Sequence, residues 1–118
     1  FCTGSLGANP DNDLVKMAKK YAAAGRIHFL HARNIRFAPP EAGELFFAES
    51  AHPTDCGSLD MSGILRALSD EGFDGYVRPD HGRNIWGEAG RPGYGLYDRA
   101  LGATYLLGLM EGIEKTKH

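Results

Sequence analysis

The sequence has 118 residues, only two cysteines, and no run of about 18 apolar residues of the kind that a transmembrane helix needs. Its first residues lack the basic region and apolar stretch that mark a signal peptide. The cysteines, Cys2 and Cys56, show no CxxC spacing, and secreted disulfide-bonded domains usually carry more of them. These absences argue against a membrane span and a disulfide framework, so we expect a reducing, cytoplasmic setting.

The chain also lacks an excess of positive charge. Thirteen Lys and Arg stand against 15 Asp and Glu, and the single basic cluster is the tail at 115–118. This balance argues against nucleic acid or a membrane surface as a partner. The sequence has no initiator Met and opens on what reads as the end of a strand. We therefore expect a piece cut from a longer protein.

Amphipathic helices are predicted in three places. The first follows an N-cap at Asn12 or Asp13 and ends at Gly25, where glycine allows a left-handed backbone. The second runs from a cap at Asp60 to a similar end at Gly72. The third covers about 96–115. Its predicted buried face consists of Leu96, Ala100, Ala103, Leu107, Met110 and Ile113.

Short strands alternate with these helices. One lies within 26–34, another at 75–78, and the chain begins on the end of a third. Residues 34–57 accommodate no regular element longer than a few residues, and 82–95 form a glycine-rich loop. The order of strands and helices predicts an α/β fold of repeated βα units with a parallel sheet.

Potential metal ligands fall at the ends of these three strands. They are Cys2, His31 and Asp80, and the carboxyl ends of parallel strands share one edge of a sheet. A thiol, an imidazole and a carboxylate suit a transition metal better than Ca²⁺ or Mg²⁺. Taken singly, each has a more ordinary reading: a small buried hydrophobe for Cys2, a half-buried histidine for His31 and a turn cap for Asp80.

Further polar side chains are expected at the same edge. His81 directly follows Asp80 and can act as a general acid or base near neutral pH. Tyr94 lies between two glycines before the last helix, where a packing role is the alternative. Three arginines surround this edge and could hold a carboxylate in bidentate fashion. They are Arg33, Arg78 and Arg83.

Several stretches together resemble the C-terminal third of the mannonate dehydratase family. They are FCTGSLGANPDND at 1–13, RIHFLHARN at 26–34, LDM at 59–61, VRPDHGR at 77–83 and PGYG at 92–95. The resemblance implies that residues 1–118 are a single partial domain, the C-terminal portion of a (β/α)₈ TIM barrel. It also implies a lyase of hexuronate (glucuronate) catabolism that converts D-mannonate to 2-keto-3-deoxy-D-gluconate and water.

Roles for individual residues follow from this resemblance. It implies Cys2, His31 and Asp80 as ligands of Mn²⁺, Fe²⁺ or another divalent metal, with a second histidine ligand contributed from upstream of Phe1. It further implies His81 and Tyr94 as the acid and base, in an order that the sequence leaves open. The residues expected to bind substrate are Arg33, His52 and Arg78.

The expected partners are a sugar acid and either a second copy of the chain or the remainder of the barrel. A closed barrel of this type takes about 250 residues, so we expect the 118-residue chain to have little activity alone. Two alternatives stay open. One is another metal-dependent barrel enzyme resembling a sugar isomerase, and the other is a non-catalytic fragment or assembly module.

Overall fold

The structure, a computed structural model, describes every residue except 40, 42, 44, 45 and 118. Its helices are α1 (Thr3–Gly7), α2 (Leu14–Ala23), α3 (Met61–Asp70), α4 (Leu96–Lys115) and the short 3₁₀ helix η2 (Thr54–Cys56). Its strands are β1 (Phe29–His31), β2 (Ile35–Phe37), β3 (Phe47–Glu49) and β4 (Tyr76–Arg78). The predicted α/β class and the three longer helices are confirmed, whereas α1 was not expected.

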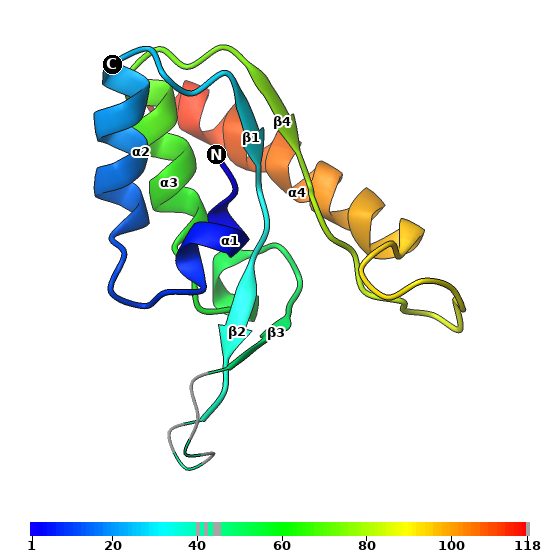
Figure 1. The fold of residues 1–118 in the computed structure, drawn as a ribbon. Helices are drawn as coiled ribbons and strands as arrows, with labels where there is room; N and C mark the ends of the chain where they lie inside the picture. Colours follow the sequence, from blue (N-terminus) through cyan, green and yellow to red (C-terminus); the bar gives the residue numbers. More distant parts are fainter. Residues whose placement is uncertain (40, 42, 44–45, 118) are drawn as a thin grey trace.

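Parallel pairing connects segments that are far apart in the sequence. β1 pairs with β4 in parallel, with His31 opposite Arg78 (Figure 1). Cys2 adds a parallel bridge to His31 on the other side of β1. Three chain segments therefore run in the same direction, and their carboxyl ends meet at one edge, as the strand and helix order predicts.

Helices α2 and α3 lie side by side on one face of the β1–β4 pair, and α4 packs against α3 (Figure 1). Local signals define where the first two begin and end. The carboxylates of Asp13 and Asp60 cap α2 and α3, accepting hydrogen bonds from backbone N–H groups at 3.1 and 3.0 Å respectively. Gly25 and Gly72 follow the helices with φ of +69° and +77°, the left-handed conformation expected of them.

The core lies between these helices and the sheet. Apolar side chains from β1, α2 and α3 are almost completely buried there. They include Ala18, Leu30, Ile64 and Leu68. Their burial fixes the position of β1, and so places the residues at its carboxyl end.

The predicted buried face of α4 is largely wrong. Leu96 and Leu107 are 63% and 66% exposed, and Ala100 is exposed as well. Of the predicted face only Ile113 is buried, and the other buried residues of α4 are Asp98, Gly102 and Leu106. The apolar residues of α4 are spread over all sides of the helix, so their periodicity alone does not select a buried face. The contacts with neighbouring segments decide which face is buried.

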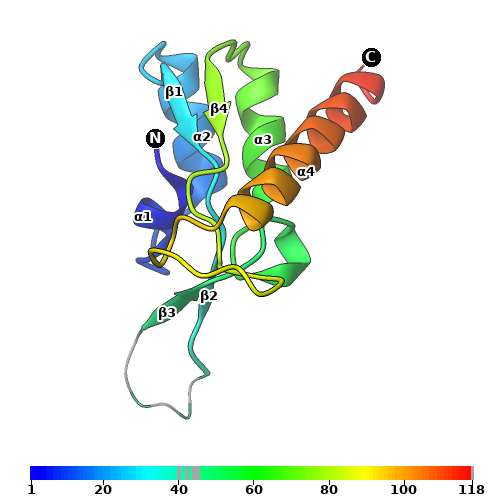
Figure 2. The ribbon, with the colours of Figure 1, turned by 90° about the vertical axis from the view of Figure 1, so that its right-hand side faces the viewer.

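Residues 34–57 contain an antiparallel hairpin and η2. β2 pairs with β3 so that Ile35 lies opposite Glu49 and Phe37 lies opposite Phe47. Each strand has three residues, which agrees with the expectation of short elements only. Figure 2 shows this hairpin and the loop that joins β4 to α4 at the same end of the molecule. Within the described residues, no helix is long and apolar enough to cross a membrane.

Candidate metal centre

Three side chains that the sequence singles out lie together at the carboxyl ends of the parallel segments. One ligand atom from each of Cys2, His31 and Asp80 lies within 4.8 Å of the others. His31 Nδ1 is 3.1 Å from one carboxylate oxygen of Asp80, and Cys2 Sγ is 3.7 Å from the other. All three residues are partly buried, so the cluster is enclosed yet reachable from solvent.

Thr3 positions the cluster. Its side chain is completely buried. The single hydrogen of the hydroxyl is shared between the carbonyl oxygens of Arg33 at 2.6 Å and His31 at 3.2 Å, and the hydroxyl oxygen accepts from the backbone N–H of Arg33 at 2.8 Å. These bonds tie the start of α1 to the end of β1, and so hold Cys2 beside His31.

The donor set fits a borderline transition metal. Metal–ligand distances of about 2.0–2.3 Å place two ligand atoms of one ion within roughly 4.6 Å of each other. The observed limit of 4.8 Å between the ligand atoms is close to that value, so only a small adjustment would be needed. The thiol sulfur, the imidazole nitrogen and the carboxylate oxygen are ligands that such metals accept together.

His81 lies between this cluster and an acidic residue from the hairpin. Its Nε2 is 3.6 Å from Asp80 Oδ2, and its Nδ1 is 2.9 Å from Glu49 Oε1. The backbone explains this position of the ring, because Asp80 and His81 come shortly after the end of β4, while Glu49 ends β3. The imidazole therefore adjoins the candidate metal ligands, where the sequence predicted it.

Glu49 is the residue of this site that the sequence analysis missed. Its carboxylate also accepts hydrogen bonds from the guanidinium of Arg33, from Nε at 3.1 Å and from Nη2. Burial alone lowers the pKa of Arg33, but the hydrogen bond and charge of Glu49 outweigh burial and raise that pKa above its ordinary value. No local motif marks Glu49, because its position depends on the pairing of β2 with β3.

Tyr94 is presented by a closed loop. The loop is held at its base by bonds from Gly82 N to Gly93 O at 3.1 Å and from Gly95 N to Gly82 O at 2.9 Å. Tyr94 is 51% exposed, and Gly93 lies against the His81 ring, where an added Cβ would be 3.6 Å from Nδ1. This exposure favours an accessible phenol over the packing role considered from sequence.

The remaining predicted residues lie around the cluster. Arg78 is exposed at the end of β4, opposite His31 in the sheet. His52 is 2% exposed, with its ring against Gly102 of α4. Burial is the main cause that lowers the pKa of His52. A hydrogen bond with the His81 backbone opposes this effect, so the buried His52 ring lies next to the backbone of His81.

Arg83 turns away from the cluster toward α4. Its backbone N–H and its Nε donate to Asp98 Oδ2 at 2.8 and 2.9 Å, and its Nη2 donates to Oδ1 at 3.2 Å. Asp98 is 1% exposed. The pair anchors the loop that carries Tyr94 to the first turn of α4.

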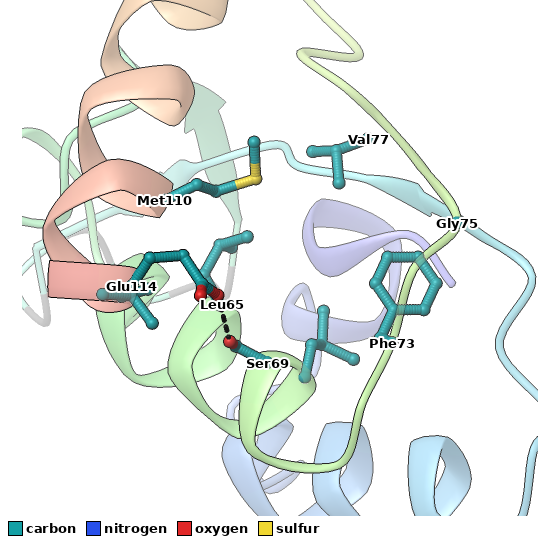
Figure 3. Close-up of a pocket in the computed structure, with 9 residues that line it drawn as sticks. Leu65, Ser69, Phe73, Gly75, Val77, Met110 and Glu114 are labelled. Atoms are coloured by element: carbon teal, nitrogen blue, oxygen red, sulfur yellow. Dashed lines mark hydrogen bonds between the residues drawn. The ribbon is translucent and has the colours of Figure 1, made fainter. Parts of the chain in front are cut away.

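An apolar cavity is also present between α3, α4 and β4, shown in Figure 3 with side chains including Leu65, Phe73 and Met110. It borders Gly75, just before β4, and Val77, in the middle of that strand, whereas Asp80 of the candidate metal centre follows the end of the strand. It offers few polar groups, so we do not assign it to the site.

Comparison with known proteins places these features in one family. The family model described as D-mannonate dehydratase (UxuA) matches residues 1–118. Proteins named mannonate dehydratase from Thermotoga petrophila and Lactococcus lactis subsp. cremoris are 58% and 57% identical over 117 residues. Those alignments cover 99% of this chain and 31% and 32% of the relatives, so the chain spans about a third of their length.

A solved structure agrees with the sequence relatives. The crystal structure of mannonate dehydratase from Streptococcus suis serotype 2 superposes with a TM-score of 0.87 and 43% identity. The match covers 97% of this chain and 32% of that one. Matching sequence and backbone over nearly all of its residues, the chain belongs to the mannonate dehydratase family.

Proposed function

We propose that this chain is part of a metal-dependent D-mannonate dehydratase that forms 2-keto-3-deoxy-D-gluconate and water. The observation that carries the proposal is the convergence of Cys2, His31 and Asp80 beside His81, from segments far apart in the sequence. The parallel segments with a common carboxyl edge support the further proposal that the chain is the C-terminal portion of a (β/α)₈ barrel. We use "complete enzyme" for a protein of the relatives' full length that includes residues 1–118.

In this proposal Cys2, His31 and Asp80 hold Mn²⁺, Fe²⁺ or a similar divalent ion, and the rest of the complete enzyme supplies the remaining ligand. When bound, such an ion supplies Lewis-acid chemistry that makes the proton beside a carboxylate easier to remove.

Residues of this chain carry out the proton transfers of the proposed dehydration. Dehydration requires removal of the C2 proton and protonation of the departing C3 hydroxyl. His81, next to the cluster, and the exposed phenol of Tyr94 are the groups available at this edge for the two steps. We propose that they share these tasks.

Substrate binding completes the proposal. The exposed guanidinium of Arg78 suits the carboxylate of a sugar acid. Arg33 reaches the same edge with its guanidinium held by Glu49. His52, buried against α4, would act on the substrate only through the packing of its loop.

Metal analysis of the complete enzyme tests the ligand assignment. Cys2→Ala and Asp80→Asn should each lower Mn²⁺ affinity at least tenfold, because each removes a ligand atom. The matched control Cys56→Ala changes the exposed second cysteine and should leave affinity unchanged. Absence of metal uptake by the unaltered protein would favour the assembly module instead.

Product analysis with D-mannonate tests the reaction. Tyr94→Phe should lower kcat by about 10²–10⁴, the usual contribution of a general acid or base, with bound metal and thermal stability unchanged. Tyr97→Phe is the control, since Tyr97 is a similarly exposed tyrosine that packs against Trp86. Formation of a ketose from an aldose, with no 2-keto-3-deoxy acid from D-mannonate, would support the isomerase alternative.

A further inference from the structure

The hairpin brings an acidic residue to the imidazole of His81, although nothing in the sequence connects the two. Glu49 ends β3, and its Oε1 is 2.9 Å from His81 Nδ1. The same carboxylate is bound by Arg33 through two nitrogens. Arg33, Glu49 and His81 thus form a continuous chain of polar contacts that ends beside Asp80.

In this series of contacts, the donor and the acceptor of each hydrogen bond are determined by the residue types. An ionised carboxylate only accepts hydrogen bonds, so its partner on the imidazole must be an N–H group. The guanidinium of Arg33 donates to the Glu49 carboxylate through two nitrogens and so fixes the direction of that carboxylate. A neutral His81 then carries its hydrogen on Nδ1 and keeps its lone pair on Nε2.

The second ring nitrogen faces the candidate metal centre. His81 Nε2 lies 3.6 Å from Asp80 Oδ2, on the side of the ring opposite Glu49. The hydrogen bond to Glu49 also restricts rotation of the ring. Both the tautomer and the direction of the free nitrogen therefore depend on a residue that does not touch the metal cluster.

We propose that Glu49, held by Arg33, is a positioning residue that keeps His81 protonated on Nδ1 and turns Nε2 toward the metal cluster. On the basis of the proposed function, Nε2 is the atom through which His81 exchanges a proton with the substrate. The tautomer does not depend on that function: Glu49 Oε1 is within hydrogen-bond distance of Nδ1 at 2.9 Å, whereas Asp80 Oδ2 is beyond it from Nε2 at 3.6 Å.

The burial of Arg33 and Glu49, beside a His81 side chain that is 35% exposed, supports a specific role over an incidental surface contact. The side chains of Arg33 and Glu49 are 12% and 26% exposed, and Arg33 also lies over the ring of Phe47, 5.7 Å from its centroid. Contacts from two elements therefore determine where the carboxylate points. A mobile surface pair would leave the imidazole free to turn.

Nitrogen NMR of the complete enzyme tests the tautomer without measuring activity. The protein is labelled with ¹⁵N-histidine and loaded with diamagnetic Zn²⁺, and the His81 signals are identified by their loss in His81→Asn. We expect a protonated Nδ1 and an unprotonated Nε2 in the unaltered protein. In Glu49→Ala the two nitrogens should instead show the averaged shifts of mixed tautomers.

Kinetics with D-mannonate and Mn²⁺ give a second readout. Glu49→Ala should lower kcat about 10–100-fold, the usual effect of losing such an orienting partner, with little change in bound metal. A change in KM would report the release of Arg33, which Glu49 also holds. Placing Glu49→Ala in a His81→Asn background should cause no further loss, because the two residues act as one unit. Glu41→Gln alters an exposed carboxylate between β2 and β3 and serves as the control.

Glu49→Gln keeps the size of the side chain, so it serves if the alanine variant does not fold. Its amide can donate as well as accept, and should also give mixed tautomers. A wild-type His81 protonated on Nε2, or ¹⁵N shifts that stay unchanged in both Glu49→Ala and Glu49→Gln, would overturn the proposal. The expected pattern in a protein that does not dehydrate D-mannonate would refute the proposed function and leave the role of Glu49 standing.

Discussion

At the scale of single residues, the buried carboxylate of Asp98 shows how charge is used away from the metal cluster. Asp98 is 1% exposed and accepts three hydrogen bonds from Arg83. It lies in the first turn of α4, where the helix dipole favours a negative charge. Burial raises the pKa of Asp98, but the bonds and charge of Arg83 outweigh burial and hold that pKa below its ordinary value.

Asp98→Asn should therefore destabilise the complete enzyme at neutral pH, by about 1–3 kcal/mol because a charged hydrogen-bond partner is lost. The cost stays below that of a fully buried pair, since the Arg83 side chain is 42% exposed and can regain water. Denaturant unfolding of both proteins at pH 7 measures the difference in the free energy of unfolding.

The pH dependence of that difference has a definite sign. The folded-state pKa of Asp98 lies below its unfolded value of 3.8, so the stabilising effect is present above that pH and is lost as the pH falls through the folded-state pKa. Unfolding free energies of the two proteins should begin to converge only below pH 3.8 and become equal once the pH is below the folded-state pKa. A difference that stays constant into that range would mean that the charge of Asp98 does not matter.

At the scale of elements, α4 carries glycines in contrasting surroundings. Gly102 is buried, and a Cβ added there would lie 2.5 Å from the His52 ring. An added Cβ at Gly108 would meet nothing within 4 Å. The close approach of α4 to the loop around His52 explains why a glycine that weakens the helix is tolerated inside it.

Alanine substitutions at the two positions should have opposite effects on the thermal midpoint of the complete enzyme. Gly108→Ala should stabilise by about 0.5–1 kcal/mol through helix propensity. Gly102→Ala gains the same propensity but must displace a buried ring, and we expect a net loss of about 1–2 kcal/mol. Equal shifts at both positions would show that α4 does not rest on His52.

At the scale of the whole molecule, the exposed surface is larger than its mass requires. The accessible area is 7228 Å², whereas a compact protein of this mass exposes about 6300 Å². Large apolar side chains contribute to the excess, with Tyr76 82%, Trp86 71% and Leu107 66% exposed. In the described residues β4 pairs with β1 on one side alone, which leaves its other edge open.

The 118-residue chain alone should accordingly show little or no dehydratase activity with Mn²⁺, and should self-associate through its open edge and apolar surface. Turnover of D-mannonate per chain, compared with that of the complete enzyme, measures the first effect, and sedimentation measures the second. A monomeric chain with the complete enzyme's rate would contradict both expectations.

Much of the fold follows from local signals. The caps at Asp13 and Asp60 and the glycines after α2 and α3 define helix ends, because each depends on a few neighbouring residues. The alternation of strands and helices predicts parallel strands, and with them the meeting of His31 and Asp80 at one edge. The motif around Asp80, combined with the other matched stretches, indicates the family as well.

What the sequence by itself determined is therefore the α/β order, the helix limits and which ligands share the edge, since spacing and chain direction suffice for these. The tertiary structure alone decided which face of α4 is buried and that Glu49 meets His81. The apolar residues of α4 lie on all sides of the helix, so only its contacts with neighbouring segments decide which face is buried. Glu49 reaches the imidazole through strand pairing between distant residues, which no local pattern encodes.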